Sequence, residues 1–309
     1  MPICLFAYLI ICEMYHIPAL LKETVSGLVT RTDGTYVDAT FGGGGHSRAI
    51  LERLTKGGTL YGLDQDEDAM ANIAATEEVA KASGAEFRFV RTNFRYLGNW
   101  MDYYAVGTVD GILADIGVSF HHFDEAERGF SFRFDGPLDM RMNQRAQRSA
   151  ADIVNNYEAE DLARVLYLYG ELRDSRAIAR RIISKRPITR IQELVSAVGE
   201  EKKTLTCVFQ ALRIEVNDEL GALRELLETA QRALRPGGRI AVLTYHSLED
   251  RIVKNYLRAG NTEGTVEKDF YGNAITPWKV IEKGMTPSEE EVARNPRARS
   301  AKLRIAEKR

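Results

Sequence analysis

Four consecutive glycines, Gly42–Gly45, follow a short run rich in β-forming residues, Tyr36–Phe41, and precede a stretch with helical character, His46–Leu54. Glycine has no Cβ, so a turn built from it lets the backbone approach a ligand closely. Strand, glycine-rich turn and helix, in that order, form the cofactor-binding edge of many open α/β sheets. We therefore expect a cofactor at this turn. The alternative is a turn that serves only to pack the helix against the strand.

Three more segments after the turn have strand character, and helical segments alternate with them. Thr59–Asp64 and Glu86–Asn93 enclose an alanine-rich helical stretch, Glu67–Ala82. Val109–Gly117 is apolar almost throughout, which is typical of a strand buried on both faces of a sheet. This alternation predicts a parallel sheet with right-handed helical crossovers.

The alternation stops in the middle of the chain and later resumes. From Ser149 to Leu212 the pattern is helical, and Ala159–Tyr169 has apolar residues at helical spacing. A helix over Asp218–Leu234 and a strand over Arg239–Tyr245 then follow. The expected architecture is an open, Rossmann-like α/β sheet that is interrupted after its fourth strand by an all-α insertion.

Two helix starts and two strands complete the expected elements. Thr189–Gln192 has the residue types of a capping box, and Asp250 is placed to close another box at the start of a helix over Leu248–Ala259. The expected final strands, which could pair as a hairpin at the sheet edge, are Lys279–Glu282 and Ala301–Ala306.

The composition excludes several classes of protein. The formal net charge of −2 over 309 residues means that nucleic-acid binding would rest on local basic patches. The three cysteines form no C-x-x-C pair, and no His, Cys and Asp cluster has metal-ligand spacing, so we expect neither a zinc ribbon nor a catalytic metal. Such sparse cysteines fit a reducing cytoplasm. Cys207 is expected to be a buried small hydrophobe rather than the nucleophile that methylation of pyrimidine C5 requires.

The first residues of the chain are apolar but resemble no membrane or secretion signal. Met1–Cys12 is too short to span a bilayer and lacks the basic start and cleavage site of a signal peptide. It is either a loosely docked extension or the product of a start codon assigned too early, with Met14 as the true start. We favour the second interpretation, assign residues 1–14 no function and expect no membrane association.

The glycine-rich turn does not carry the dinucleotide fingerprint G-x-G-x-x-G. Read from Gly42, the third position holds Ser47, and read from Gly43 it holds Arg48. The third glycine is therefore missing in both registers, which weakens the case for NAD.

Three carboxylates around the turn favour S-adenosyl-L-methionine instead. Asp38 lies inside the first expected strand, where turns that bind this cofactor carry an acidic residue. Asp64 closes the second strand, where a carboxylate accepts hydrogen bonds from ribose hydroxyls. Asp115 ends the fourth strand, beside the place where the cofactor and the reacting atoms would meet.

A series of motifs runs from Tyr15 to the C-terminus. They are Tyr15–Pro18, Leu20–Glu23, Val37–Ser47, Asp110–Ser119, Glu127–Phe132, Asp135–Met142, Phe209–Asn217, Tyr245–Arg251 and Asn295–Ser300. In this order they resemble the family of 16S ribosomal RNA cytosine-N4 methyltransferases, RsmH, formerly MraW. The run Asp-Gly-Pro-Leu-Asp-Met-Arg-Met at Asp135–Met142 is especially characteristic.

The resemblance implies a fold, an activity and a set of contacts. It implies a class I methyltransferase domain over residues 15–122 and 214–309, with a helical, RNA-recognising insertion over 123–213. It implies methyl transfer from S-adenosyl-L-methionine to the N4 amine of a cytidine in the decoding centre of 16S rRNA, within the small ribosomal subunit. The implied cofactor contacts are Gly44, Gly45, His46, Asp64, Phe94, Asp115 and His122.

Three positions depart from the family pattern. His122 stands where the family has glutamine, Leu172 follows Glu171 where a second glutamate is usual, and Thr206–Val208 differs ahead of Phe209. These departures concern the substrate side more than the cofactor side.

The N4 amine of cytosine is a poor nucleophile because its lone pair is delocalised into the ring. Acceptors for its N–H protons would stabilise the positive charge that develops during attack. We expect Asp115 and nearby backbone carbonyls to act in this way, although Asp115 could instead serve only to bind the cofactor. His246, at the end of the fifth strand, could touch the base or a phosphate, or could belong to the helix cap over Ser247–Asp250.

Binding to RNA requires cations that meet phosphates. One basic group comprises Arg173, Arg176, Arg180, Arg181, Lys185, Arg186 and Arg190, and another comprises Arg294, Arg297, Arg299, Lys302, Arg304, Lys308 and Arg309. The expected RNA contacts are Arg141, Arg176, Arg180, Arg213 and Asn217. For Arg141, a structural ion pair with Asp139 is the alternative. For the whole chain, the alternatives are an amino-methyltransferase with another substrate and a non-catalytic RNA-binding assembly factor.

Overall fold

The computed structural model describes residues 18–117 and 125–309. The expectations about residues 1–14 and about His122 lie outside these ranges. The chain divides into two compact units, one formed by residues up to 117 and from 220 onward, the other by residues 118–219. The boundaries expected from the sequence, after 122 and after 213, fall close to these positions.

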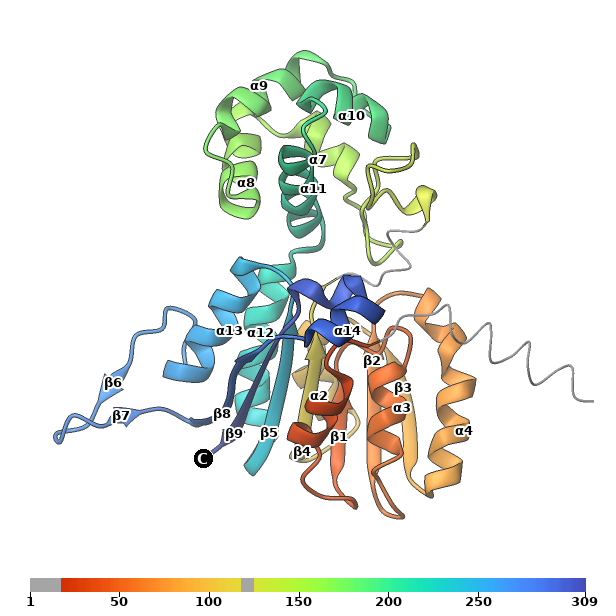
Figure 1. The fold of residues 1–309 in the computed structure, drawn as a ribbon, viewed down its shortest axis with the longest axis vertical. Coiled ribbons are helices and arrows are strands. Elements are labelled where there is room, and N and C mark those ends of the chain that lie inside the picture. Colours follow the sequence, from red (N-terminus) through yellow and green to blue (C-terminus); the bar gives the residue numbers. More distant parts are fainter. Residues whose placement is uncertain (1–17, 118–124) are drawn as a thin grey trace, which may run out of the picture. The chain divides into compact units, whose positions relative to one another are not determined.

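The first unit contains a seven-stranded sheet in the order β3-β2-β1-β4-β5-β9-β8 (Figure 1). The strands are β1 (Thr35–Asp38), β2 (Thr59–Asp64), β3 (Glu86–Arg91), β4 (Val109–Asp115), β5 (Leu234–Thr244), β8 (Trp278–Met285) and β9 (Lys302–Lys308). The first five are parallel to one another, whereas β9 is antiparallel to both β5 and β8. This is the class I methyltransferase arrangement that the sequence predicted.

Helices cover the sheet on both faces. They are α2 (Leu21–Leu28), α3 (Gly45–Leu51), η1 (Asp68–Asn72), α4 (Ile73–Ser83), η2 (Phe94–Tyr96), α5 (Leu97–Tyr103), α12 (Glu219–Ala233), α13 (Ser247–Ala259), α14 (Glu289–Arg294) and η4 (Pro296–Ser300). In Figure 1, α2 and α3 lie in front of the sheet and α12 behind it. Leu28 of α2, Ile50 of α3 and Leu113 of β4 are fully buried in one core cluster. Burial of these apolar faces is what fixes the sheet between its helices.

The C-terminal part of the sheet differs from the expected edge hairpin. β8 and β9 do pair, but β9 is an inner strand because it lies between β5 and β8. The helices α14 and η4 separate the two strands in the chain, so they are not joined by a tight turn. A separate two-stranded ribbon, β6 (Glu267–Lys268) and β7 (Ala274–Ile275), precedes β8.

The second unit is helical, as predicted. Its elements are η3 (Ala126–Arg128), α7 (Ala150–Asn156), α8 (Ala159–Gly170), α9 (Ser175–Ser184), α10 (Ile191–Val198) and α11 (Lys202–Asn217). Leu162, Leu166, Ile178 and Leu212 are fully buried in a core of its own. Cys207 packs against this core but is only partly buried, which corrects the expectation of full burial. Burial still raises the pKa of its thiol, so the thiol stays protonated.

The residues predicted to close two helix caps were wrong by one position in the sequence. At α10, the backbone N–H groups of Thr189 and Arg190 donate to Glu193 Oε2 at 2.7 and 3.0 Å, so Glu193 rather than Gln192 closes the cap. At α13, Glu249 takes the role expected of Asp250, since it accepts from the backbone N–H of His246. Among the described residues, no helix is long and apolar enough to cross a membrane.

Candidate functional site

The glycine-rich turn begins where β1 ends, and its glycines have different uses. Gly42 and Gly44 have φ values of 47° and 71°, which strain any residue with a side chain. A Cβ on Gly44 would lie 2.8 Å from the Arg48 guanidinium and 2.9 Å from the Thr76 hydroxyl, so Gly44 also serves packing. Among the described residues, a Cβ on Gly42 would meet only the Thr40 carbonyl, at 3.8 Å, so these residues leave the space beside Gly42 open. The turn therefore both packs against its neighbours and leaves room for a ligand.

Two buried side chains brace the turn from beneath. Asp38, the last residue of β1, accepts a hydrogen bond of 2.7 Å from the hydroxyl of Ser47 in α3. It also accepts from the backbone N–H of Thr40 at 3.1 Å. Burial raises the pKa of Asp38 above its ordinary value, and the hydrogen bond from Ser47 opposes that rise. Asp38 thus shapes the turn rather than facing a ligand.

Asp64 links the end of β2 to the turn. Its Oδ2 accepts a hydrogen bond of 2.8 Å from the backbone N–H of Gly42, and its Oδ1 accepts one of 2.9 Å from the N–H of Asp66. The carboxylate is partly exposed. Phe94, also partly exposed, begins η2 directly after Asn93, whose amide donates to the Gln65 side chain at 2.8 Å. The ends of β2 and β3 are therefore tied together beside the turn.

Asp115 ends β4 and lies between two side chains from other elements. The hydroxyl of Tyr245, one residue beyond β5, donates a hydrogen bond of 2.8 Å to Asp115 Oδ1. His46 Nδ1 lies 3.6 Å from Asp115 Oδ2. The backbone N–H of Asp115 donates to the Thr40 hydroxyl at 2.7 Å. The carboxylate is thus held at the carboxyl edge of the sheet, where the sequence placed it.

His46 is a buried, neutral imidazole. Its Nε2 lies 3.2 Å from the carbonyl of Ala19, so the ring N–H there donates to that carbonyl. Burial lowers the pKa of His46 below its ordinary value. The ring therefore fixes the start of α3 relative to the segment that precedes α2.

His246 is the cap residue of α13, which confirms the alternative that the sequence left open. Its Nδ1 accepts from the backbone N–H of Glu249 at 3.4 Å, and its Nε2 lies 2.9 Å from Glu249 Oε1. Its side chain is only 10% exposed. A contact of this ring with a base or phosphate stays a prediction.

The residues gathered at this edge suit S-adenosyl-L-methionine. Gly42 offers an open backbone approach, Asp64 offers acceptors of the kind that bind ribose hydroxyls, and Asp115 offers acceptors for an ammonium group. All of them lie at the carboxyl ends of parallel strands, where open α/β sheets bind their ligands. The sequence placed Asp64 and Asp115 at strand ends, where the structure has them, but did not single out Tyr245, Thr40 and Ser47. For Tyr245, the available signal was its place directly after the fifth strand.

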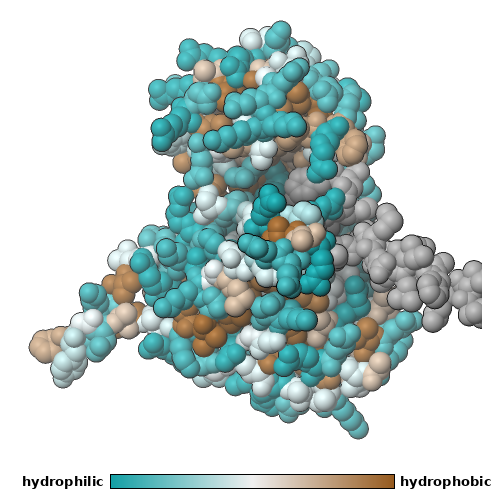
Figure 2. Space-filling model, viewed as in Figure 1, coloured by the Kyte–Doolittle hydropathy of each residue, from teal (hydrophilic) through white to brown (hydrophobic). Residues whose placement is uncertain are grey.

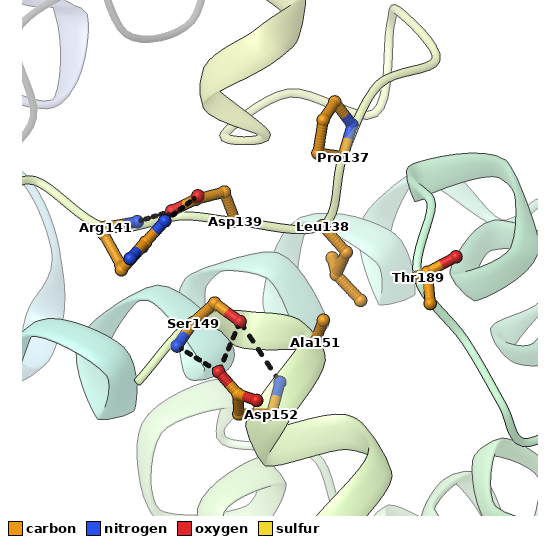
Figure 3. A pocket seen from close by; sticks show the side chains of 8 residues that line it. All are labelled: Pro137, Leu138, Asp139, Arg141, Ser149, Ala151, Asp152 and Thr189. Atoms are coloured by element: carbon orange, nitrogen blue, oxygen red, sulfur yellow. Dashed lines mark hydrogen bonds and ion pairs between the residues drawn. The ribbon is translucent and has the colours of Figure 1, made fainter. Parts of the chain in front are cut away.

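The second unit holds the other predicted residues, and Arg141 is paired there with Asp139. The guanidinium donates to the two Asp139 oxygens at 2.8 and 2.6 Å and to the carbonyl of Ala146 at 2.7 Å. This confirms the structural ion pair that the sequence offered as the alternative. Figure 3 shows the pair at a pocket of about 230 Å³ that also includes Ser149 and Asp152. Ser149 and Asp152 form the capping box of α7, so these polar groups satisfy one another.

Arg213 and Asn217 also make internal contacts. Arg213 forms a two-pronged ion pair with Glu219, at 2.8 and 3.1 Å, and both side chains are almost fully buried. Asn217 accepts from the backbone N–H of Met142 and donates to the carbonyl of Met140, both at 2.8 Å. Asn217 thus fastens the characteristic Met140–Met142 segment to the end of α11, and Arg213 ties α11 to the residue that follows it closely in the chain, Glu219.

The helix α9 presents unpaired cations. Arg176 and Arg180 are exposed, as are Arg173 and Lys185 nearby, and none has an ion-pair partner among the described residues. Arg190, by contrast, pairs with Asp135 at 2.8 Å. The face of this unit shown in Figure 2 is mainly hydrophilic. In the second predicted basic group, Lys302 and Arg304 both pair with Asp250.

Comparison with known proteins identifies the family. The model of the MraW methylase family matches residues 13–309. The ribosomal RNA small subunit methyltransferase H of Parabacteroides distasonis is 57% identical over 95% of this chain and 97% of its own length. The protein of the same name from Porphyromonas gingivalis strain ATCC 33277 is 54% identical over 96% of this chain and 97% of its own length. The chain therefore belongs to the MraW methylase family, whose members are S-adenosylmethionine-dependent methyltransferases.

Proposed function

We propose that this protein transfers a methyl group from S-adenosyl-L-methionine to the N4 amine of a cytidine in the decoding centre of 16S rRNA, within the small ribosomal subunit and in the cytoplasm. The observation that carries the proposal is the Asp115 carboxylate, held by Tyr245 at the carboxyl edge of the sheet. The names of the relatives, which are ribosomal RNA small subunit methyltransferases, support the class of substrate.

The residues that would hold the cofactor surround the glycine-rich turn. They are Gly44, Gly45, His46, Asp64, Phe94 and Asp115, while His122 lies outside the described residues. The bound cofactor supplies an electrophilic methyl group on a sulfonium sulfur. Asp64 would orient the ribose through its acceptors, and the open backbone at Gly42 would admit the cofactor to the edge of the sheet.

The protein's own contribution to the reaction is to position and polarise the amine. Asp115 would accept a hydrogen bond from an N4 proton, which makes the nitrogen lone pair more available and stabilises the charge that develops on nitrogen. As the N–C bond forms, the amine must lose one proton, and an acceptor already bonded to that proton lowers the cost of this loss. Alignment of the amine with the methyl group would carry much of the remaining rate.

The helical unit would bind the RNA. Arg176 and Arg180 of α9 are exposed and suited to phosphates, whereas Arg141, Arg213 and Asn217 would act mainly by shaping the segment around Met140. A cytidine must leave its stack to reach a cofactor held at a sheet edge. Cations of the helical unit would hold the flanking backbone while the base is splayed out.

The proposal is tested by supplying the purified protein and labelled S-adenosyl-L-methionine with small ribosomal subunits, naked 16S rRNA or DNA. Mass spectrometry of the nucleosides should find N4-methylcytidine in the ribosomal substrates. Methylation of DNA alone would favour an amino-methyltransferase with another substrate. If calorimetry detects no binding of S-adenosyl-L-methionine, the result would favour a non-catalytic assembly factor.

A further inference from the structure

We propose that Tyr245 is a positioning residue for methyl transfer, and that its hydroxyl holds the Asp115 carboxylate in the orientation in which it meets the amine of the target base. This inference rests on the proposed function. The two side chains come from neighbouring parallel strands, because Asp115 ends β4 and Tyr245 follows β5. The hydroxyl donates to Asp115 Oδ1 at 2.8 Å, the ordinary length of an O–H···O hydrogen bond.

The phenol ring is fixed from several sides. The backbone N–H of Tyr245 donates to Glu249 Oε2 at 2.9 Å, and Glu249 is fully buried in the first turn of α13. The ring packs against the core cluster that contains Leu113 and Leu243. It also lies beside Gly117, where φ is 136° and a Cβ would come within 3.4 Å of the ring. The hydroxyl therefore reaches Asp115 from a rigid support, as precise positioning requires.

The hydroxyl keeps its proton at neutral pH and is therefore the donor in its hydrogen bond with Asp115. Burial, followed by the negative charge of Asp115, raises the pKa of Tyr245 well above its ordinary value. The proton thus stays on the phenol oxygen, and the Asp115 carboxylate accepts the hydrogen bond. A hydrogen bond donated to the ionised form of an acid favours that form.

The surrounding charges make this hydrogen bond consequential. Among the described residues, Asp38 from β1 and His46 from α3 act on Asp115 or lie beside it, and Glu249 from α13 and Glu291 from α14 act on Tyr245. Asp38 and Asp115 repel each other when both are ionised, because each carries a negative charge. His46 is neutral, because burial lowers its pKa, and so supplies no compensating charge. The Tyr245 hydroxyl is therefore a contact that favours the ionised, accepting form of Asp115.

The test compares Tyr245→Phe with a matched control, Tyr256→Phe. Tyr256 is buried, whereas Tyr245 is partly buried. Replacement of Tyr256 by Phe likewise removes one hydrogen bond, of 2.8 Å to the Gln231 side chain, but Tyr256 lies in the body of α13. Initial rates on small ribosomal subunits are measured across the acidic pH range, and the Kd for S-adenosyl-L-methionine is measured by calorimetry. Urea unfolding of the cofactor-free protein is measured for Tyr245→Phe, Asp115→Asn and the double variant.

We expect kcat of Tyr245→Phe to fall about tenfold to a hundredfold, the range for losing a hydrogen bond to a charged group. The acidic limb of its pH profile should move to higher pH, while that of Tyr256→Phe should match wild type. The unfolding equilibrium constants of the double-variant cycle should show coupling of about tenfold.

Two results would overturn the inference while the wild-type protein methylates its substrate. One is a Tyr245→Phe variant with the wild-type rate and pH profile. The other is a loss explained entirely by weaker cofactor binding, since Tyr245 would then serve the cofactor instead of the amine. A wild-type protein that methylates no substrate would instead contradict the proposed function itself.

Discussion

The Asp38 carboxylate and the Ser47 hydroxyl, on either side of the glycine-rich turn, are joined by a hydrogen bond of 2.7 Å and are both buried. Ser47→Ala would leave a buried carboxylate with fewer donors. We expect the free energy of unfolding to fall by about 1–3 kcal/mol. Urea unfolding measures this directly. Ser184→Ala, which removes an exposed hydroxyl from the end of α9, is the control and should have little effect.

The buried imidazole of His46 predicts a loss of stability in mild acid. Burial lowers the pKa of the folded-state imidazole below its ordinary value of 6.5. As the pH falls through 6.5, the unfolded chain takes up a proton at His46 but the folded chain does not. The free energy of unfolding that is present above pH 6.5 is therefore lost as the pH falls below it. The slope can reach about 1.4 kcal/mol per pH unit. Urea unfolding between about pH 7.5 and pH 5.5 should show this slope in wild type and a reduced one in His46→Asn. Equal slopes would mean that His46 titrates alike in both states.

Replacing Asp115 separates its two candidate roles. Asp115→Ala should lower kcat by about 10² to 10³, the range for losing one preorganised electrostatic contact, with an unchanged circular dichroism spectrum. If Asp115 only bound the cofactor, saturating S-adenosyl-L-methionine would restore the rate. Near-normal turnover would remove Asp115 from the chemistry altogether.

Asp64 should control affinity for the cofactor. Its carboxylate supports the backbone of Gly42 and would accept hydrogen bonds from the ribose. Asp64→Ala should therefore weaken binding of S-adenosyl-L-methionine at least about tenfold, as calorimetry would measure. Asp102→Ala, in the exposed part of α5, should bind like wild type. If Asp64→Ala binds S-adenosyl-L-methionine with unchanged affinity, then Asp64 does not bind the ribose.

The exposed cations of α9 should act on RNA alone. Replacing Arg176 and Arg180 by glutamine should weaken binding to 16S rRNA and reduce the salt slope of log K by about two, because each phosphate contact contributes about one. Binding of S-adenosyl-L-methionine should not change. Arg88→Gln, on exposed β3, removes a charge from the other unit and serves as the control. If the double variant keeps the wild-type RNA affinity and salt slope, then Arg176 and Arg180 do not contact RNA and this face of α9 is an ordinary solvated surface.

Much of the fold was readable because hydrophobic periodicity is a local signal. The expected strand Val109–Gly117 corresponds to β4, and the expected helix Ala159–Tyr169 corresponds to α8. The errors arose where tertiary contacts decide. Asp250 has the spacing of a capping residue but instead pairs with Arg304 and Lys302 from β9, more than fifty residues away, which local spacing cannot reveal.

The positions of the carboxylates at the candidate site were predictable from the sequence, but the residues that support them were not. Asp64 and Asp115 stand at strand ends, and strand ends can be read from the sequence. The role of Tyr245 depends on β5 lying beside β4, although more than one hundred residues separate them in the chain. Likewise, Arg213 looks like a free cation until Glu219 is seen to pair with it.

The inner position of β9 has a consequence for how the protein is made. β9 is translated after the other six strands, yet it fills the place between β5 and β8 and buries Leu303 and Ile305. Until residues 302–308 have left the ribosomal exit tunnel, β5 exposes an unpaired edge of the kind that promotes aggregation. The sheet can therefore be completed only after β9 has been synthesised. Deletion of residues 302–308 would open the sheet in its interior rather than shorten its edge.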